Sequence, residues 1–220
     1  SLVAGDHADV ISRGFIEGYY GNPWSTRDRV ALMEWGGYYK LNAYFYAPKD
    51  DPKHNSQWRE KYTQSEIDEK IKPLAEAGNK SKVRFVYALH PFMHNPITKD
   101  NYDETFEIMK AKFLQVIDAG TRQIAILADD AGYQLGPNES AGNHTGELYK
   151  RLLDDTTAWL RELQNEKNPD GTFKYPGLKD TLIFCPVNYM GHGENWYRTL
   201  GENVQVINTG GQVWGKIDNA

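Results

Sequence analysis

The sequence predicts an α/β protein whose parallel strands close into a (β/α)8 barrel of the TIM type, with only about six βα units within its 220 residues. Apolar runs alternate with helical patterns, which is typical of βαβ units and a parallel sheet. Polar side chains follow nearly every run, and in a barrel these strand ends meet at one pocket. An open doubly wound sheet is the alternative, but no glycine-rich phosphate-binding loop follows any of these runs.

Six apolar runs are expected to be strands, and helices are expected between them. The near-continuous hydrophobicity of these runs is typical of strands that are buried on both faces. The strands are expected at residues 13–18, 42–47, 83–89, 123–128, 181–186 and 204–207. The helices are expected from residue 25, then at 65–77, 101–119 and 147–164, with a short one at 196–200.

The helix expected at 101–119 has the clearest pattern. Its apolar residues recur at helical spacing, and Gly120 follows where helices commonly end. These residues are Phe106, Met109, Phe113, Val116 and Ile117. The helix after the first strand is expected to begin near Ser25, whose hydroxyl can cap its first turn. The polar segment 165–177 is expected to be a surface loop.

Composition and charge narrow the class of protein. Hydrophobic residues make up 40% and charged residues 25%, as in a soluble globular domain. A net charge of −5 without a basic stripe argues against nucleic acid and anionic membranes as partners. The only cysteine, Cys185, can form neither an internal disulfide nor a cysteine zinc site. The first residues lack a secretion signal, which a mature secreted protein would also lack.

Asp129 and Asp130 come directly after the apolar run 124–128. Two adjacent carboxylates repel each other, so one should hold its proton more tightly. One neutral and one ionised carboxyl group are what acid-assisted cleavage of a glycosidic bond requires. Both can reach one substrate only if the chain turns directly after the strand, which Ala131-Gly132 permits. The alternative interpretation is a turn aspartate followed by a helix cap.

Other polar groups follow the second and third strands. Lys49 is able to donate to sugar hydroxyls while Asp50 or Asp51 braces the loop, although a proline-punctuated turn with a helix cap explains the same residues. His90 and His94 have the spacing of a metal pair on a helix, but neighbouring prolines disfavour a helix there. We therefore expect no metal site.

Three segments resemble glycoside hydrolase family 84, the O-GlcNAcases and bacterial hyaluronidase-like β-N-acetylglucosaminidases. They are RGFIEGYYGNPWS (13–25), LNAYFYAPKDDPKH (41–54) and AILADDAG (125–132). FCPVNY (184–189) and VINTGGQV (206–213) support the match, which runs from about residue 12 to the end. The resemblance implies a retaining exo-β-N-acetylglucosaminidase that removes terminal β-linked GlcNAc from glycans or O-GlcNAc proteins. It implies no metal and no organic cofactor.

By this resemblance, catalysis is substrate-assisted. The 2-acetamido oxygen of the sugar attacks the anomeric carbon and forms an oxazoline. Asp129 then accepts a hydrogen bond from the acetamido N–H, and Asp130 acts first as general acid and next as general base. The resemblance also implies a set of substrate-binding residues around the sugar and its acetamido group. They are Gly18, Tyr20, Lys49, Cys185, Tyr189, Thr209 and Val213.

The sequence ends before the region where this family carries further sugar-binding residues. We therefore expect residues 1–220 to be a single, incomplete catalytic barrel domain that lacks its last two βα units. Either another chain or a second copy completes the barrel, or the sequence is part of a longer enzyme. The partner expected is a GlcNAc-containing glycan or glycoprotein, and the localisation expected is secreted or at a bacterial cell surface.

Two other functions stay open. One is a GlcNAc- or glycan-binding fragment without turnover, which would have no need of an acid. The other is a chitinase-like or hexosaminidase-like hydrolase, but those enzymes use an Asp–Glu arrangement, and no glutamate follows Asp129.

Overall fold

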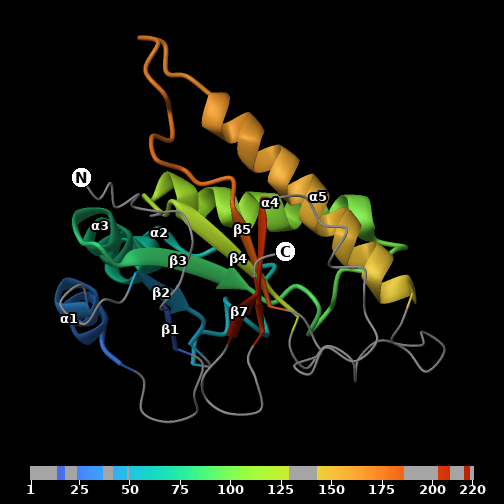
Figure 1. The fold of residues 1–220 in the computed structure, drawn as a ribbon, viewed down its shortest axis with the longest axis horizontal. Coiled ribbons are helices and arrows are strands. Elements are labelled where there is room, and N and C mark those ends of the chain that lie inside the picture. The colour runs from blue at the N-terminus through green and yellow to red at the C-terminus, as the bar shows by residue number, and fades with distance from the viewer. Residues whose placement is uncertain are drawn as a thin grey trace, which may run out of the picture.

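One seven-stranded sheet organises the computed structural model, which describes residues 14–17, 24–36, 42–48, 50–128, 143–185, 203–208 and 216–218 (Figure 1). The strands are β1 (Gly14–Glu17), β2 (Ala43–Tyr46), β3 (Arg84–Leu89), β4 (Gln123–Leu127), β5 (Leu182–Cys185), β6 (Val204–Asn208) and β7 (Lys216–Asp218). All six predicted strands are confirmed, each within two residues of its expected bounds at either end.

The strand order distinguishes a barrel from a doubly wound sheet. The strands lie in the order β1 to β7, and every neighbouring pair from β1 to β6 is parallel. A doubly wound sheet reverses its order at a switch point, whereas a barrel adds each strand beside the last. The order therefore agrees with the predicted TIM-type barrel. The short strand β7 was not predicted, and it runs antiparallel to β6, with Ile207 opposite Ile217.

Helices follow the strands where the sequence predicts them. They are α1 (Thr26–Gly36), α2 (Gln64–Glu66), η2 (Ile67–Ile71), α3 (Lys72–Lys80), α4 (Tyr102–Asp118) and α5 (Asn143–Asn165). The Ser25 hydroxyl caps α1 as expected, because it accepts a hydrogen bond from the Asp28 N–H at 3.1 Å. The helix expected at 65–77 begins with a capping box between Thr63 and Glu66, and it contains a π-helical turn, η2. The short helix expected at 196–200 lies outside the described residues.

The sheet has two faces that differ in the size of their side chains. One face carries large residues, which pack against the helices in the main core. These strand residues are Tyr44, Tyr46, Phe85, Tyr87, Ile124, Ile126, Leu182, Phe184, Val204 and Val206. The helices contribute residues such as Met33, Leu74, Phe113 and Leu160. Figure 1 shows α4 and α5 lying across this side of the sheet.

The opposite face carries smaller residues and forms a second core. Its members alternate along the strands with those of the main core, as the two-residue period of a strand requires. They are Ala43, Phe45, Ala47, Val86, Ala88, Ala125 and Ile183, with Leu127 packed against them. Because helices cover the other face, this second core faces the interior of the barrel.

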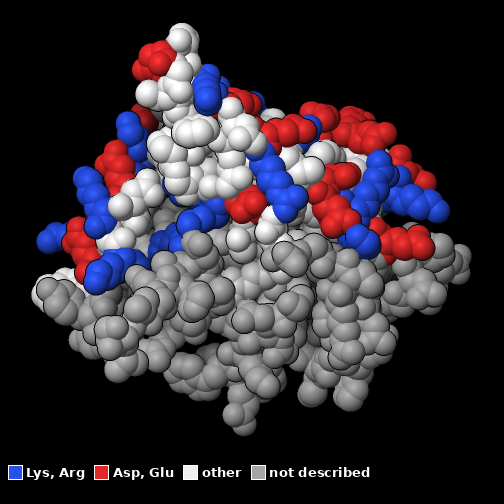
Figure 2. Space-filling model, turned by 45° about the horizontal axis from the view of Figure 1, so that its top comes forward, with Lys and Arg blue, Asp and Glu red and all other residues white. Residues whose placement is uncertain are grey.

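The described residues on the face shown in Figure 2 carry charges of both signs. Lys and Arg side chains are interspersed with Asp and Glu in Figure 2. The segment 165–177 is an exposed loop, as predicted, which projects beyond the end of α5 (orange in Figure 1). Among the helices that the structure describes, none has the length and hydropathy to cross a bilayer.

Candidate active site

The carboxyl ends of six parallel strands lie at one edge of the sheet. The register aligns Glu17 with Tyr46, the last residues of β1 and β2, and it aligns Tyr46 with Tyr87, two residues before the end of β3. Leu127, the last residue of β4, is likewise opposite Cys185, the last residue of β5. In barrel enzymes this edge holds the active site, because the loops that follow the strands meet there.

Eight of the nine predicted site residues lie outside the described residues, in segments that follow these strand ends. They are Gly18, Tyr20, Lys49, Asp129, Asp130, Tyr189, Thr209 and Val213. Some of them come directly after a described strand in the sequence. Gly18 is the first residue after β1, and Thr209 is the first residue after β6. Asp129 follows β4 with only Ala128 between.

Cys185 is the predicted site residue that the structure does describe. It is the last residue of β5 and is 6% exposed. It lies two residues after Ile183, which belongs to the second core, so its side chain shares the interior face of the sheet. Its backbone carbonyl accepts a hydrogen bond from the Ala128 N–H at 2.8 Å. The end of β4, directly before Asp129, is therefore tied to the end of β5.

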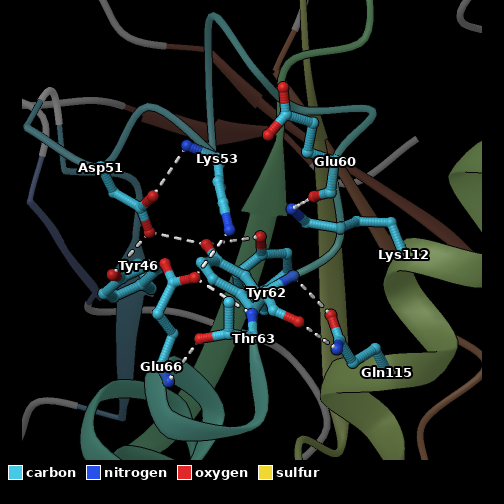
Figure 3. A network of polar contacts seen from close by, with 10 residues as sticks. Tyr46, Asp51, Lys53, Glu60, Tyr62, Thr63, Glu66, Lys112 and Gln115 are labelled. Atoms are coloured by element: carbon cyan, nitrogen blue, oxygen red, sulfur yellow. Dashed lines mark hydrogen bonds and ion pairs between the residues drawn. The ribbon is translucent and has the colours of Figure 1, made fainter.

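The segment between β2 and α2, residues 47–63, is the β2–α2 loop, and it carries Lys49. Asp51 anchors this loop from a buried position, with 5% exposure. Its Oδ2 accepts hydrogen bonds from the hydroxyls of Tyr46, at 2.8 Å, and Tyr62, at 2.6 Å (Figure 3). Its Oδ1 accepts one from the Lys53 N–H at 2.9 Å. Of the two aspartates that the sequence suggested as braces, the described contacts assign this role to Asp51.

A tyrosine cluster surrounds this carboxylate. The Tyr62 hydroxyl lies 2.9 Å from the Tyr87 hydroxyl, and the rings of Tyr46 and Tyr87 stack with centroids 5.9 Å apart. Burial, reinforced by the Asp51 charge, raises the pKa of all three phenols well above the usual value of 10.0. The phenols therefore stay protonated, and those of Tyr46 and Tyr62 remain donors to Asp51.

A second buried contact joins the same loop to β3. His54 is 2% exposed, and its Nδ1 lies 2.6 Å from the carbonyl oxygen of Ala88, a residue of the second core. The loop is thus held to β2 through Tyr46 and to β3 through Ala88. Among the described residues, no three histidine, cysteine or acidic side chains gather into a metal site.

The tyrosine cluster was not predicted from the sequence. Tyr46, Tyr62 and Tyr87 are far apart along the chain, and each looks like an ordinary core aromatic in its own strand or turn. The available signal was Asp51, an acidic residue five positions after the end of a buried strand, where an unpaired buried charge would be costly.

With this geometry described, we compared the chain with known proteins. The family model described as beta-N-acetylglucosaminidase matches residues 13–220. The chain belongs to this β-N-acetylglucosaminidase family. The match includes every strand and every predicted site residue, and it confirms the resemblance to glycoside hydrolase family 84.

Curated relatives of this β-N-acetylglucosaminidase domain include Protein O-GlcNAcase of Rattus norvegicus and of Mus musculus. Each is 30% identical to it over 214 residues, which cover 92% of this chain and 21% of the relative. The chain therefore spans about a fifth of the length of these relatives.

Solved structures give the same result for the fold. CpGH84B matches with a TM-score of 0.70 and 32% identity, over 91% of this chain and 34% of that one. CpGH84D matches with a TM-score of 0.71 and 31% identity, over 91% and 32%. A variant of the O-GlcNAc hydrolase of Thermobaculum terrenum matches with a TM-score of 0.71 and 25% identity, over 91% and 41%. The predicted TIM-type barrel fold is thereby confirmed.

Proposed function

We propose that the protein is a retaining exo-β-N-acetylglucosaminidase that hydrolyses terminal β-linked GlcNAc from glycans or O-GlcNAc proteins. The observation that carries this proposal is the family match over residues 13–220, which spans the strand β4 and the aspartate pair directly after it. The hydrolase names of the curated relatives support the same reaction class.

In the proposed reaction, the sugar supplies its own nucleophile. The 2-acetamido oxygen attacks the anomeric carbon, and the bond to the leaving oxygen breaks as an oxazoline forms. Holding the two reacting atoms in one molecule is worth an effective concentration of about 10⁵ M or more. Asp129 accepts a hydrogen bond from the acetamido N–H, which orients this group and stabilises the positive charge that develops on it.

Asp130 moves the protons. As a carboxylic acid it protonates the leaving oxygen, and as a carboxylate it then removes a proton from the water that opens the oxazoline. Attack of this water at the anomeric carbon gives a product with the configuration of the substrate. General acid–base catalysis of this kind contributes about 10²- to 10⁴-fold.

The remaining proposed contacts divide between the two sides of the sugar. Gly18, Tyr20 and Lys49 follow the first two strands and serve the hydroxyl side. Four residues serve the acetamido side: Cys185 ends the fifth strand, Tyr189 comes after it, and Thr209 and Val213 come after the sixth. The position of Cys185 on the interior face of the sheet supports this second group, because a small buried thiol leaves room for a methyl group.

The test is release of 4-nitrophenol from its β-N-acetylglucosaminide by the full natural polypeptide, compared with Asp129→Asn and Asp130→Asn. Asp154→Asn is the matched control, because Asp154 is a half-exposed carboxylate on α5. We expect both site variants to lose at least about 100-fold in kcat/KM and the control to keep its rate.

A second substrate separates the two roles. Methyl β-N-acetylglucosaminide has a poor leaving group, so Asp130→Asn should lose far more on it than on the nitrophenyl substrate. Asp129→Asn should lose about equally on both. Saturable GlcNAc binding by a wild-type protein without turnover would instead favour the glycan-binding alternative.

A further inference from the structure

Residues at both ends of the β2–α2 loop bind the same buried carboxylate, that of Asp51. Tyr46, the last residue of β2, donates to Asp51 from one side, and Tyr62, near the start of α2, donates from the other (Figure 3). Lys49 stands between Tyr46 and Asp51 in the chain. These two hydrogen bonds connect Asp51 to both β2 and the residues directly before α2.

The far end of the loop is fixed again from α4. The Gln115 side chain accepts from the Tyr62 N–H at 2.9 Å and donates to the Tyr62 carbonyl at 2.8 Å. The Lys112 ammonium group donates to the Glu60 carbonyl and lies 4.1 Å from the centre of the Tyr62 ring. Tyr62 therefore has little freedom, so its hydroxyl presents a fixed point to Asp51.

The near end of the loop depends on Asp51 more directly. Lys49 stands only two residues before Asp51 in the sequence, and two residues of extended chain span about 7 Å at most. The Asp51 side chain also accepts from the Lys53 N–H, and the Lys53 ammonium group reaches Glu66 of α2 at 2.6 Å. Asp51 thus joins the start of the loop to β2, to Tyr62 and to the helix that follows.

We propose that Asp51 is a positioning residue that holds Lys49 against the hydroxyl edge of the sugar by fixing the β2–α2 loop. This inference rests on the proposed function, in which Lys49 contacts the substrate. It adds a residue that does not touch the sugar. The tyrosine cluster around Asp51 then serves substrate binding as well as the core.

A double-mutant cycle tests this inference in the full natural polypeptide. We expect Asp51→Asn to lower kcat/KM about 10- to 100-fold, because small displacements of a binding group have effects of that order. In a Lys49→Ala background, the same substitution should change kcat/KM less than about twofold, because Asp51 is proposed to act through the Lys49 side chain, which this background lacks. Tyr62→Phe, which keeps the ring but removes one donor, should give a smaller effect with the same dependence on Lys49.

The matched control is Tyr102→Phe. The Tyr102 hydroxyl donates to Asp155 at 2.7 Å, which is also a tyrosine–aspartate bond, but it joins α4 to α5 and its aspartate is half-exposed. We expect this variant to lose stability through the missing hydrogen bond and to keep its kcat/KM within about twofold. Equal losses of kcat/KM in the control and in Tyr62→Phe would overturn the inference, as would additive effects of Asp51→Asn and Lys49→Ala.

Amide hydrogen exchange supplies a readout that needs no substrate. Asp51→Asn should speed exchange in residues 50–63 at least about tenfold, and Tyr102→Phe should leave that segment unchanged. Unchanged exchange in Asp51→Asn would contradict the positioning role, even in an active enzyme. A wild-type protein without turnover would instead overturn the proposed function, and the inference with it, whatever the exchange rates are.

Discussion

The Ala128 N–H donates a hydrogen bond to the Cys185 carbonyl at 2.8 Å. This bond joins the last residue before Asp129 to the last residue of β5. The proposed catalytic pair follows Ala128 in the chain, and Cys185 belongs to the proposed acetamido pocket. The bond therefore holds together the two strand ends nearest to these proposed parts of the site. The sheet therefore fixes the positions of Ala128 and Cys185 relative to each other.

Shortening Cys185 is expected to widen the acetamido pocket. Cys185→Ala should raise the ratio of kcat/KM for an N-propanoyl substrate over the N-acetyl substrate about tenfold, because room for a methylene is worth factors of that size. Ile183→Val is the control. It removes a methyl group from the same face of β5, two residues before Cys185. A similar ratio in wild type and in Cys185→Ala would remove Cys185 from the pocket.

Lys112 is expected to make stability rise with pH above neutrality. It is fully buried, and desolvation lowers its pKa from 10.5 to about 8. Between these values the unfolded chain binds the proton and the folded protein does not, so the free energy of unfolding increases with pH. Relative to Lys112→Met, the wild type should gain about 2 kcal/mol between pH 7 and about 9.5.

Urea unfolding at both pH values measures this gain, with the exposed Lys72→Met as the control. The range stops below 10 because the buried tyrosines act in the opposite direction there. Their raised pKa values keep protons on the folded protein that the unfolded chain loses. A constant difference between wild type and Lys112→Met would show that Lys112 titrates normally.

Glu66 is expected to contribute to stability at neutral pH and to lose this contribution in acid. Its hydrogen bonds with the Lys53 ammonium group and the Thr63 N–H lower its pKa from 4.5 to about 2. The stabilisation is present above pH 4.5 and disappears as the pH falls towards 2. Because the carboxylate is partly exposed, we expect about 1 kcal/mol.

Acid unfolding of Glu66→Gln tests this expectation. The variant should be less stable than wild type at pH 7 and equally stable near pH 2. Glu76→Gln, on the exposed side of α3, should follow the wild-type curve at both ends. A wild type and a Glu66→Gln variant that differ equally at all pH values would rule out an ionic contribution.

A side chain added at Gly78 is expected to lower the stability of the protein, although Gly78 lies within a helix. A Cβ atom there would lie 2.7 Å from both the Cβ and the backbone nitrogen of Phe85 on β3. Alanine gains about 1 kcal/mol in helix propensity, but such a contact forces α3 away from the sheet. Gly78→Ala should therefore destabilise the protein by about 1 to 2 kcal/mol in thermal or urea unfolding. An increase in stability, as in the exposed control Glu76→Ala, would contradict the close packing of α3.

Much of the fold was predictable because local patterns and tertiary structure agree. In α4, Met109, Phe113, Val116 and Ile117 recur at helical spacing, and all four are fully buried. Strand β7 gave no comparable signal, since it has three residues, of which only Ile217 is strongly apolar. The π-helical turn at η2 also has no marker in the sequence, because its residues suit an ordinary helix equally well.

The strand ends near the candidate site were predictable, because a single segment carries the information for each, whereas contacts between distant segments were not. AILADDAG indicates a strand end with two carboxylates, and FCPVNY places Cys185 at another. The burial of Lys112 could not be foreseen, because a lysine in a helix normally faces solvent. Its environment is formed by Glu60 and Tyr62, about 50 residues earlier in the chain, and only the packed structure brings them together.

The most direct measurement is the configuration of the GlcNAc that the protein first releases, followed by proton NMR during early hydrolysis of a β-linked substrate by the full natural polypeptide. A retaining mechanism predicts that the β-anomer appears first and that the α-anomer follows only by mutarotation. Initial release of the α-anomer would exclude the proposed oxazoline route. The absence of any GlcNAc release would contradict the proposed hydrolase itself.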